Sequence, residues 1–392
     1  MNSPVLPDRV DVVVVGARAA GAATAMLLAR FGLEVLAVER AAYGSDTLST
    51  HALMRAGVLQ LARWGLLDRL REAGTPLVRK TTFIYGDQTV EVEIKAKNGV
   101  EGLYGPRRTV LDALLVDAAR ESGAEVVHGL QMTGVLRAAD GRACGIEMID
   151  SAGSMHRVEA SWVVGADGRA SRVAREVEAR VLHSPPAAGC SVYGYFRGLA
   201  TDGYEWRYVP GASTGAIPTN GGVCVFAAVS RERFLREIAP DVARGYARIL
   251  EEVSPDLSRA VADAEQLEPL RGFPGEPGFL KQAWGQGWAL VGDAGYFKDP
   301  ITAHGITDAL RDAELLARAI ASGRESALDD YQVQRDALST ELLDVTSAVA
   351  SYDWTLDEVQ ALHRELSESM KREVKALLAL GDVPAARSRR TA

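Results

Sequence analysis

Residues 12–21 read VVVVGARAAG, a run of valines followed by a turn that contains two glycines. Uninterrupted β-branched residues predict a strand buried on both faces of a parallel sheet. The Ala- and Leu-rich residues 21–31 predict a helix, and residues 35–38 predict a second strand that ends at Glu39. This order of strand, glycine turn, helix and strand forms a cradle for a dinucleotide pyrophosphate, and the acidic side chain binds the ribose hydroxyls.

The turn departs from the strict G-x-G-x-x-G pattern at its second glycine, where this chain has Arg18. That glycine normally lets the backbone approach the pyrophosphate, so the Arg18 side chain must point away from the turn. There its guanidinium can reach a phosphate or an edge of the cofactor. The residues predicted to bind this end of the cofactor are Gly16, Ala17, Arg18, Ala19, Ala20, Gly21, Glu39 and Arg40.

A second glycine-aspartate turn lies far along the chain, where residues 290–295 read LVGDAG. It follows a predicted buried strand at 288–291, which places Gly292 and Asp293 at the carboxyl edge of the sheet, where α/β sheets bind ligands. A helix predicted to begin near Ile306 would then turn its positive end toward a ring that becomes anionic on reduction. A long cofactor such as FAD needs both turns, whereas a nicotinamide dinucleotide does not.

Two arginines begin predicted helices, Arg55 and Arg108. A cation at the N-terminal end of a helix opposes its dipole, so a phosphate or a polar cofactor chain is expected to compensate it. A surface position is the alternative for each, and Arg107 is a rival to Arg108. Asp167, in the turn GADG, is predicted both to cap the next segment and to approach the cofactor.

Two histidines flank these motifs, His51 and His304. A proton-transfer role and a packed or solvated position are both compatible with their places in the sequence.

Composition excludes several classes of protein. The 392 residues are 47% hydrophobic, enough for a large core, and the formal charge of −8 argues against a nucleic-acid-binding surface. No apolar run is long enough to span a bilayer, and residues 1–4 lack the features of a signal peptide. The cysteines fit neither a metal site nor a disulfide framework, so we expect no metal and a cytoplasmic location. The oligomeric state is left open.

The predicted fold class is α/β, with a Rossmann-like domain of the glutathione-reductase type interrupted by a β-rich domain. Residues 81–95 alternate apolar and polar, which predicts a half-exposed antiparallel sheet, and aromatic residues crowd 193–208. The dinucleotide domain is predicted at 1–75, 105–180 and 275–340, and the β-rich domain at 76–104 and 181–274. Helices and a disordered tail are predicted at 341–392.

Taken together, these motifs resemble those of the group A FAD-dependent aromatic hydroxylases, the para-hydroxybenzoate hydroxylase family. The resemblance covers residues 10 to about 350. It depends on five segments: 16–21 with Glu39, 55–59, the helix beginning at Arg108, 165–168 and 292–305.

The resemblance implies bound FAD that NADH or NADPH reduces and that then reacts with dioxygen. A flavin hydroperoxide would hydroxylate an aromatic or polycyclic small molecule. Arg55 and Arg108 would touch the diphosphate or the ribityl chain, and Asp293 would bind the ribityl chain. Gly305 and Ile306 would offer backbone N–H groups to the ring, and Pro300 would lie near its oxygen-reacting face.

A hydroperoxide survives only where water is excluded, so the second domain is expected to cover the ring. Its candidate substrate residues are Tyr193, Tyr195, Trp206 and Tyr208, for which plain sheet core is the alternative.

Departures from the family pattern keep other functions open. Residues 296–300 read YFKDP, so Lys298 and Asp299 stand where the hydroxylases usually have apolar residues and proline; they are either surface residues or alter the chemistry at the ring. The W-x-W-x-I-P element of flavin-dependent halogenases is absent. Residues 204–210 loosely resemble a segment of geranylgeranyl reductases. A reductase or halogenase on the same scaffold, and a flavin-free regulator, are therefore the alternatives.

Overall fold

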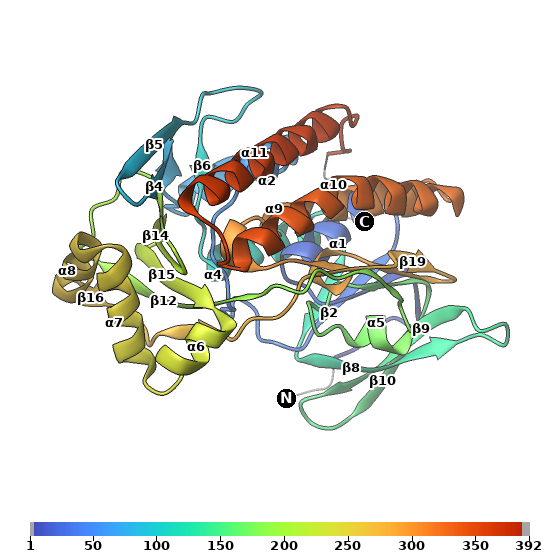
Figure 1. Cartoon of the computed structure of the whole chain (residues 1–392). Helices are drawn as coiled ribbons and strands as arrows, with labels where there is room; N and C mark the ends of the chain where they lie inside the picture. The colour runs from blue at the N-terminus through green and yellow to red at the C-terminus, as the bar shows by residue number, and fades with distance from the viewer. Residues whose placement is uncertain (1–3, 386–392) are drawn as a thin grey trace.

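The computed structural model describes residues 4–385 and is built around two β-sheets with helices packed on them (Figure 1). Strand β1 (Arg9–Val15) lies in the middle of the first sheet, whose strand order is β19-β20-β10-β1-β2-β7. All neighbours from β20 to β7 run parallel, and β19 pairs antiparallel. The other strands of this order are β2 (Val35–Glu39), β7 (Glu125–His128), β10 (Met155–Gly165), β19 (Trp284–Gly285) and β20 (Trp288–Leu290).

The valines of β1 are buried on both faces, as the sequence predicts. Val12 and Val14 pack with α1 (Ala19–Arg30), α4 (Arg108–Glu121) and α9 (Gly305–Ala321). Val13 and Val15 pack on the opposite face, which is covered by β8 (Leu130–Arg137), β9 (Ala143–Asp150) and α5 (Arg172–Glu176). The parallel unit β1-α1-β2 is thus the one that the opening motif predicts.

The second sheet has the strand order β16-β12-β15-β14-β13-β4-β5, and β17 pairs with β12. Helices α6–α8 pack on one face of this sheet. The other face lies toward the first sheet and the C-terminal helices (Figure 1). Its strands are β4 (Lys80–Tyr85), β5 (Gln88–Glu93), β12 (Gly189–Arg197), β13 (Tyr204–Val209), β14 (Ala212–Thr219), β15 (Gly222–Ser230), β16 (Glu265–Gln266) and β17 (Arg271–Phe273). The covering helices are α6 (Arg231–Glu237), α7 (Val242–Val253) and α8 (Pro255–Asp263).

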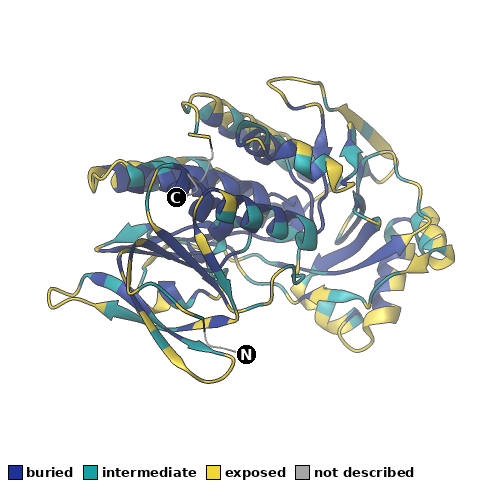
Figure 2. Cartoon of the chain, turned by 180° about the vertical axis from the view of Figure 1, so that it is seen from behind, coloured by how far each residue is buried: buried dark blue, intermediate teal, exposed yellow. Residues whose placement is uncertain are grey.

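Two long helices close the chain, α10 (Ser326–Ala350) and α11 (Leu356–Leu378), and they pack against each other and against α9 and α2 (Figure 1). Buried residues run through all of these helices and both sheets (Figure 2). The remaining elements are α2 (Arg55–Arg63), α3 (Leu67–Glu72), β3 (Leu77–Val78), β6 (Leu103–Tyr104), β11 (Val181–His183), β18 (Phe279–Lys281), β21 (Tyr296–Phe297) and the short 3₁₀ helices Gly292–Ala294 and Pro300–Thr302.

The predicted fold class is confirmed: the structure is mixed α/β, with a second β-sheet and C-terminal helices. Strands β4 and β5 of the first predicted β-rich segment and β12 to β17 of the second meet in the second sheet, although the domain boundaries themselves remain predictions. Within residues 4–385 no helix combines the length and apolar character that crossing a bilayer requires. Most of the tail predicted to be disordered, from 386 on, lies outside the described residues.

The N-terminus of α11 carries a reciprocal cap. The hydroxyl of Thr355 accepts from the backbone N–H of Glu358 at 3.3 Å, and the Glu358 carboxylate accepts from the backbone N–H of Thr355 at 2.7 Å. We expect Thr355→Ala to lower the free energy of unfolding by about 1 kcal/mol, because the helix loses a cap for its free N–H groups. Thr340→Ala, on the exposed side of α10, is the matched control and should cost nothing in urea unfolding; equal losses would contradict the role of the cap.

Candidate functional site

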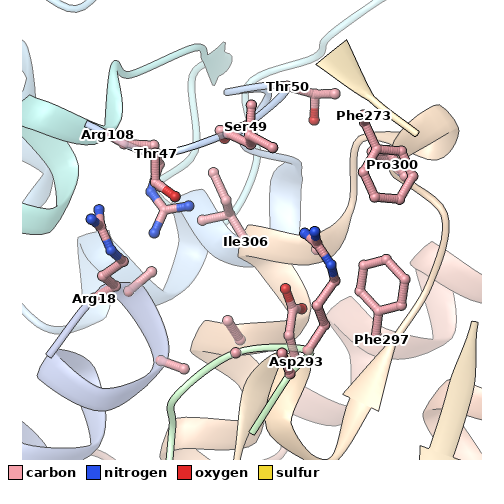
Figure 3. A pocket seen from close by; sticks show the side chains of 18 of the residues that line it. Arg18, Thr47, Ser49, Thr50, Arg108, Phe273, Asp293, Phe297, Pro300 and Ile306 are labelled. Atoms are coloured by element: carbon pink, nitrogen blue, oxygen red, sulfur yellow. The ribbon is translucent and has the colours of Figure 1, made fainter. Parts of the chain in front are cut away.

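A cavity of about 570 Å³ lies between the carboxyl ends of the parallel strands and the second sheet. Glu39 lines one end of it, Asp293 lines it further along, and Pro300 and Trp206 line the far end. The two distant glycine turns therefore open onto one shared space, as an extended ligand requires. Figure 3 shows Arg18, Arg108, Asp293 and Ile306 around this space, with Phe297 and Pro300 on its other side.

The first glycine turn is held by its own acidic partner. One oxygen of the Glu39 carboxylate accepts from the backbone N–H of Ala17 at 3.0 Å, and the other accepts from Ala41 at 2.9 Å. Gly16 has φ +98°, and a Cβ there would lie 2.4 Å from the carbonyl oxygen of Ala166. The turn thus brings backbone close to backbone at the end of β1, where a pyrophosphate is bound in this type of fold.

Arg18 points away from the turn, as the sequence predicts. Its guanidinium donates to the carbonyl of Ser45 at 3.1 Å and pairs with Asp112 at 3.2 Å, while still lining the cavity. Of the residues predicted for this end, Gly16, Arg18, Ala19, Ala20, Glu39 and Arg40 line the cavity. Ala17 and Gly21 form the turn behind it.

Arg107 and Arg108 are the two candidates for the cation at the start of α4 that faces the cofactor, and their surroundings differ. Arg108 lines the cavity and pairs with both oxygens of Asp112, each at 2.9 Å, so one turn of α4 supplies both charges. Arg107 instead pairs with Asp46 and Glu268 and stacks its guanidinium 3.6 Å from the Tyr195 ring centre. Of the two arginines, Arg108 is therefore the one that faces the cavity.

Arg55 is not among the residues that line the cavity, so its predicted contact with the cofactor remains a prediction that this side-chain position does not favour. Its side chain leaves the first turn of α2 outward and donates to the carbonyl of Lys95 at 2.6 Å, at an exposed position. The sequence placed Arg55 correctly at a helix start, but the direction of the side chain depends on the loop that contains Lys95, which no local pattern reveals.

Asp293 is half-buried midway along the cavity. Burial raises the pKa of its carboxyl to about 6, while the nearby guanidinium of Arg108 acts in the opposite direction. Gly292 before it has φ +57°, and a Cβ there would lie 2.7 Å from the Cβ of Ala20. This turn therefore packs directly on the start of α1, which links the two motifs.

Asp167 lies in the turn after β10 and lines the cavity. Its carboxylate accepts from the hydroxyl of Ser171 at 2.5 Å and from the backbone N–H of Arg172 at 2.6 Å. It thus caps the first turn of α5 at the edge of the cavity, as predicted, and its approach to the cofactor remains a prediction.

The segment before α9 forms the far end of the cavity. Lys298, Asp299, Pro300, Gly305 and Ile306 all line it. Lys298 and Asp299 are buried, so the alternative that they are surface residues is wrong. Burial raises the pKa of the Asp299 carboxyl to about 7, although that carboxyl accepts from the backbone N–H groups of Ile301 and Gly189.

Neither predicted catalytic histidine lines the cavity. His51 is buried behind it, with Nδ1 3.0 Å from the carbonyl of Pro106 and Nε2 2.5 Å from the hydroxyl of Tyr195. His304 is also buried and pairs with Glu373 at 2.8 Å. Burial lowers the pKa of both imidazoles, that of His51 to about 3, so both are neutral near neutral pH. Their catalytic roles remain predictions, and neither side chain lines the cavity.

The spacing of His304, Asp308 and Glu373 would also suit a metal ion, since one ligand atom from each lies within 4.8 Å of the others. Lys298 and Arg311 already pair with those carboxylates, so the chain itself supplies positive charge to this cluster.

Half of the predicted substrate residues reach the cavity. Tyr193 and Trp206 line it, whereas Tyr195 and Tyr208 are buried in the sheet core behind it. The sequence missed several aromatic residues of this end: Phe226, Phe273, Phe297 and Tyr352. Phe226 lies on β15, but only the register of the folded sheet shows that its ring faces the cavity.

The residues present fit an FAD molecule. Close backbone approaches at Gly16 and Gly21 leave no room for side chains where a pyrophosphate would lie, and Arg18 and Arg108 supply positive charge nearby. Asp293 offers an acceptor along the middle of the cavity, and the N-terminus of α9 points its free N–H groups into the far end.

Comparison with known proteins agrees with this fit. The FAD binding domain family matches residues 9–346. A menaquinone reductase of Mycolicibacterium smegmatis is 26% identical over 338 residues, which cover 80% of this chain and 77% of that protein. Digeranylgeranylglycerophospholipid reductase 1 of Methanococcoides burtonii is 26% identical over 334 residues, covering 81% of this chain and 75% of that protein.

Solved structures show the same fold. The flavin-dependent brominase Bmp2 superposes with a TM-score of 0.78 at 20% identity, covering 94% of this chain and 93% of that chain. PqsL, a probable FAD-dependent monooxygenase of Pseudomonas aeruginosa, superposes with a TM-score of 0.74 at 20% identity, covering 93% and 100%. With a match that spans most of its length and a cavity built from both cofactor turns, the chain belongs to the FAD binding domain family of oxidoreductases.

Proposed function

We propose that this protein is an FAD-dependent monooxygenase that uses NADH or NADPH and dioxygen to hydroxylate an aromatic or polycyclic small molecule. The observation that carries the proposal is the far end of the cavity. Six aromatic side chains line it: Tyr193, Trp206, Phe226, Phe273, Phe297 and Tyr352. Flat, uncharged rings suit an aromatic substrate, and the sheet behind them excludes water from the reacting atoms.

Bound FAD would supply hydride acceptance from the nicotinamide and activation of dioxygen. The residues of the chain then have separate tasks. Glu39 and Arg108 bind the nucleotide end, and Asp293 orients the middle of the cofactor. The N-terminus of α9 stabilises negative charge on the reduced ring, because Gly305 and Ile306 present helix N–H groups there. Pro300 bounds the space in which dioxygen and substrate meet.

A second candidate is a flavin-dependent reductase of carbon–carbon double bonds. Two curated relatives that share about a quarter of their residues with this chain are named as reductases, of menaquinone and of a digeranylgeranyl lipid. A halogenase is a third candidate, because a flavin-dependent brominase shares the fold.

The deciding experiment loads the protein with FAD and follows NADH and NADPH oxidation with neutral phenols, naphthols and indoles. We expect a substrate-stimulated consumption of NAD(P)H that matches dioxygen uptake, and a product that carries one oxygen atom from labelled dioxygen. Anaerobic reduction of a prenyl double bond, or product formation that depends on bromide or chloride, would overturn the proposal in favour of its rivals.

Asp293→Asn should weaken FAD binding. The variant loses a half-buried charged acceptor worth about 1.5–3 kcal/mol, which corresponds to a loss of affinity of roughly tenfold to a hundredfold. Because the pKa of Asp293 is raised to about 6, the affinity of the unmodified protein should fall as the pH drops through that value, while that of the variant stays flat. Fluorescence titration of the apoprotein with FAD measures both, and the exposed Asp256→Asn is the control. Equal affinities across the pH range would refute the assignment.

A further inference from the structure

A row of aromatic side chains connects the cavity with the edge of the second sheet. We call Tyr352, Trp354, Tyr208 and Tyr85 the aromatic row. The ring centres of successive members lie 5.7 Å, 6.1 Å and 5.6 Å apart. All of its members are buried, between the sheet and the segment that joins α10 to α11.

The row begins at the cavity. Tyr352 lines it together with Asp299 and Pro300, and the Tyr352 hydroxyl lies 2.8 Å from that of Ser213. Its φ of +56° lies in the left-handed region, which is unusual for a bulky residue. Such a conformation persists only where the surroundings fix it, and it is concentrated at functional sites. The chain therefore accepts backbone strain to keep this ring at the cavity wall.

The row ends at a hydrogen-bonded pair in which one partner, an imidazole nitrogen, can accept a proton. The hydroxyl of Tyr85 lies 2.8 Å from Nδ1 of His363, which is half-buried on α11. Burial lowers the pKa of His363 to about 4, so its imidazole is neutral near neutral pH and can accept from the phenol. The ring of His363 also lies 4.7 Å from that of Tyr208, so the end of the row is compact.

Packing alone does not explain the choice of residues. Phenylalanine fills such space without a buried polar group, yet the row consists only of tyrosine and tryptophan, each of which needs a partner for its polar atom when buried. The indole N–H of Trp354 donates to the carbonyl of Val349 at 2.9 Å. Tyrosine and tryptophan are the side chains that lose one electron most readily while keeping their ring intact.

We propose that the aromatic row is an electron-transfer path that carries oxidising equivalents from the flavin cavity to the Tyr85–His363 pair. This inference depends on FAD occupying the cavity and not on which substrate reacts there. Under the proposed monooxygenase function, the path would protect the cavity when activated oxygen finds no substrate.

The electrons and protons balance as follows. An oxidant in the cavity, either photoexcited oxidised flavin or a peroxide-derived one-electron oxidant, removes one electron from Tyr352 or Trp354. Tyr208 then gives an electron to the oxidised residue, and Tyr85 gives one to Tyr208. On losing its electron Tyr85 passes its phenolic proton to Nδ1 of His363, which leaves a neutral tyrosyl radical beside an imidazolium. A thiol or ascorbate in solution returns one electron, and His363 returns the proton.

The test uses the FAD-loaded protein and a blue laser flash, with transient absorption as the readout. We expect a long-lived tyrosyl radical in the unmodified protein. Tyr208→Phe breaks the row far from the flavin, so the first electron transfer should remain while the long-lived signal is lost by fast charge recombination. His363→Gln should likewise lose it, because Tyr85 then has no proton acceptor.

The matched control is Tyr246→Phe, a buried tyrosine of helix α7 that stacks on Phe196 of β12 and lies off the row. It should keep the long-lived signal. The inference is overturned if Tyr208→Phe decays like the unmodified protein, or if the control loses the signal equally. A second measurement needs no nicotinamide: repeated reduction by dithionite and reoxidation by air, followed by mass spectrometry, should show more oxidation of Cys190 and Tyr193 in Tyr208→Phe than in Tyr246→Phe. Equal damage would overturn the protective role even if the proposed hydroxylation fails.

Discussion

Gly21→Ala is expected to abolish FAD binding. A Cβ at this position would lie 1.8 Å from the carbonyl oxygen of Gly16 and 2.8 Å from its carbonyl carbon. Both atoms belong to the backbone of the turn, so no side-chain rotation relieves the contact. Helix α1 must move away from the turn, and the cradle for the pyrophosphate opens. The variant should purify colourless and show no quenching of FAD fluorescence in a titration.

The control separates this clash from the general cost of replacing a glycine. Gly123, just after α4, has φ +107°, and a methyl group added there would meet no atom within 4 Å, so Gly123→Ala introduces strain but no clash. It should lose about 1–2 kcal/mol of stability and still bind FAD. Retention of flavin by Gly21→Ala, with native circular dichroism in both variants, would show that the turn is not the pyrophosphate site.

The local motifs could be predicted from the sequence because their information is local. The valines of β1 and the glycines after them determine a strand and a turn within ten residues, and the same holds for the turn at Asp293. That Glu39 and Asp293 line one cavity also followed, since parallel strands bring their carboxyl ends to one edge of the sheet.

The rest of the site depends on contacts between distant segments. Tyr352 comes from the link between two C-terminal helices, and nothing in its neighbourhood in the sequence marks it as a cavity residue. A lysine such as Lys298 is ordinarily a surface residue, yet this one is buried because Asp308 on α9 pairs with it. The side-chain directions of Arg55, Tyr195 and Tyr208 likewise follow from the packing of the second sheet and its neighbouring loops.

A buried network of charges supports the segment that would hold the flavin ring. Arg311 on α9 is fully buried and pairs with Asp308 at 3.0 Å, with Asp312 at 2.7 Å and with Glu373 at 3.1 Å. Glu373 comes from α11 and also pairs with His304, directly before α9. Buried charges are costly unless each has a partner, so this network stabilises only one arrangement of the three segments.

Glu373→Gln is expected to be strongly destabilising, by about 3–5 kcal/mol, because Arg311 then keeps its charge in the core without that partner. The interaction with His304 and then the charges of Arg311 and Lys298 hold the pKa of the Glu373 carboxyl below its ordinary value despite its burial. A carboxyl whose pKa is lower in the folded state contributes stability that is present above its unfolded pKa, about 4.3, and is lost as the pH falls below it. The deficit of the variant should therefore be largest near neutral pH and shrink in acid.

Urea unfolding of both proteins between neutral and acid pH measures that deficit, and taking the difference cancels the other buried carboxyls, which the two proteins share. The control is Glu368→Gln on the same helix, whose exposed pair with Lys371 is worth at most about 1 kcal/mol. A deficit that stays constant with pH would assign the loss to packing and not to charge. If instead Glu373→Gln unfolds like the control, Arg311 finds enough compensation in Asp308 and Asp312, and α11 does not anchor the segment beneath the ring.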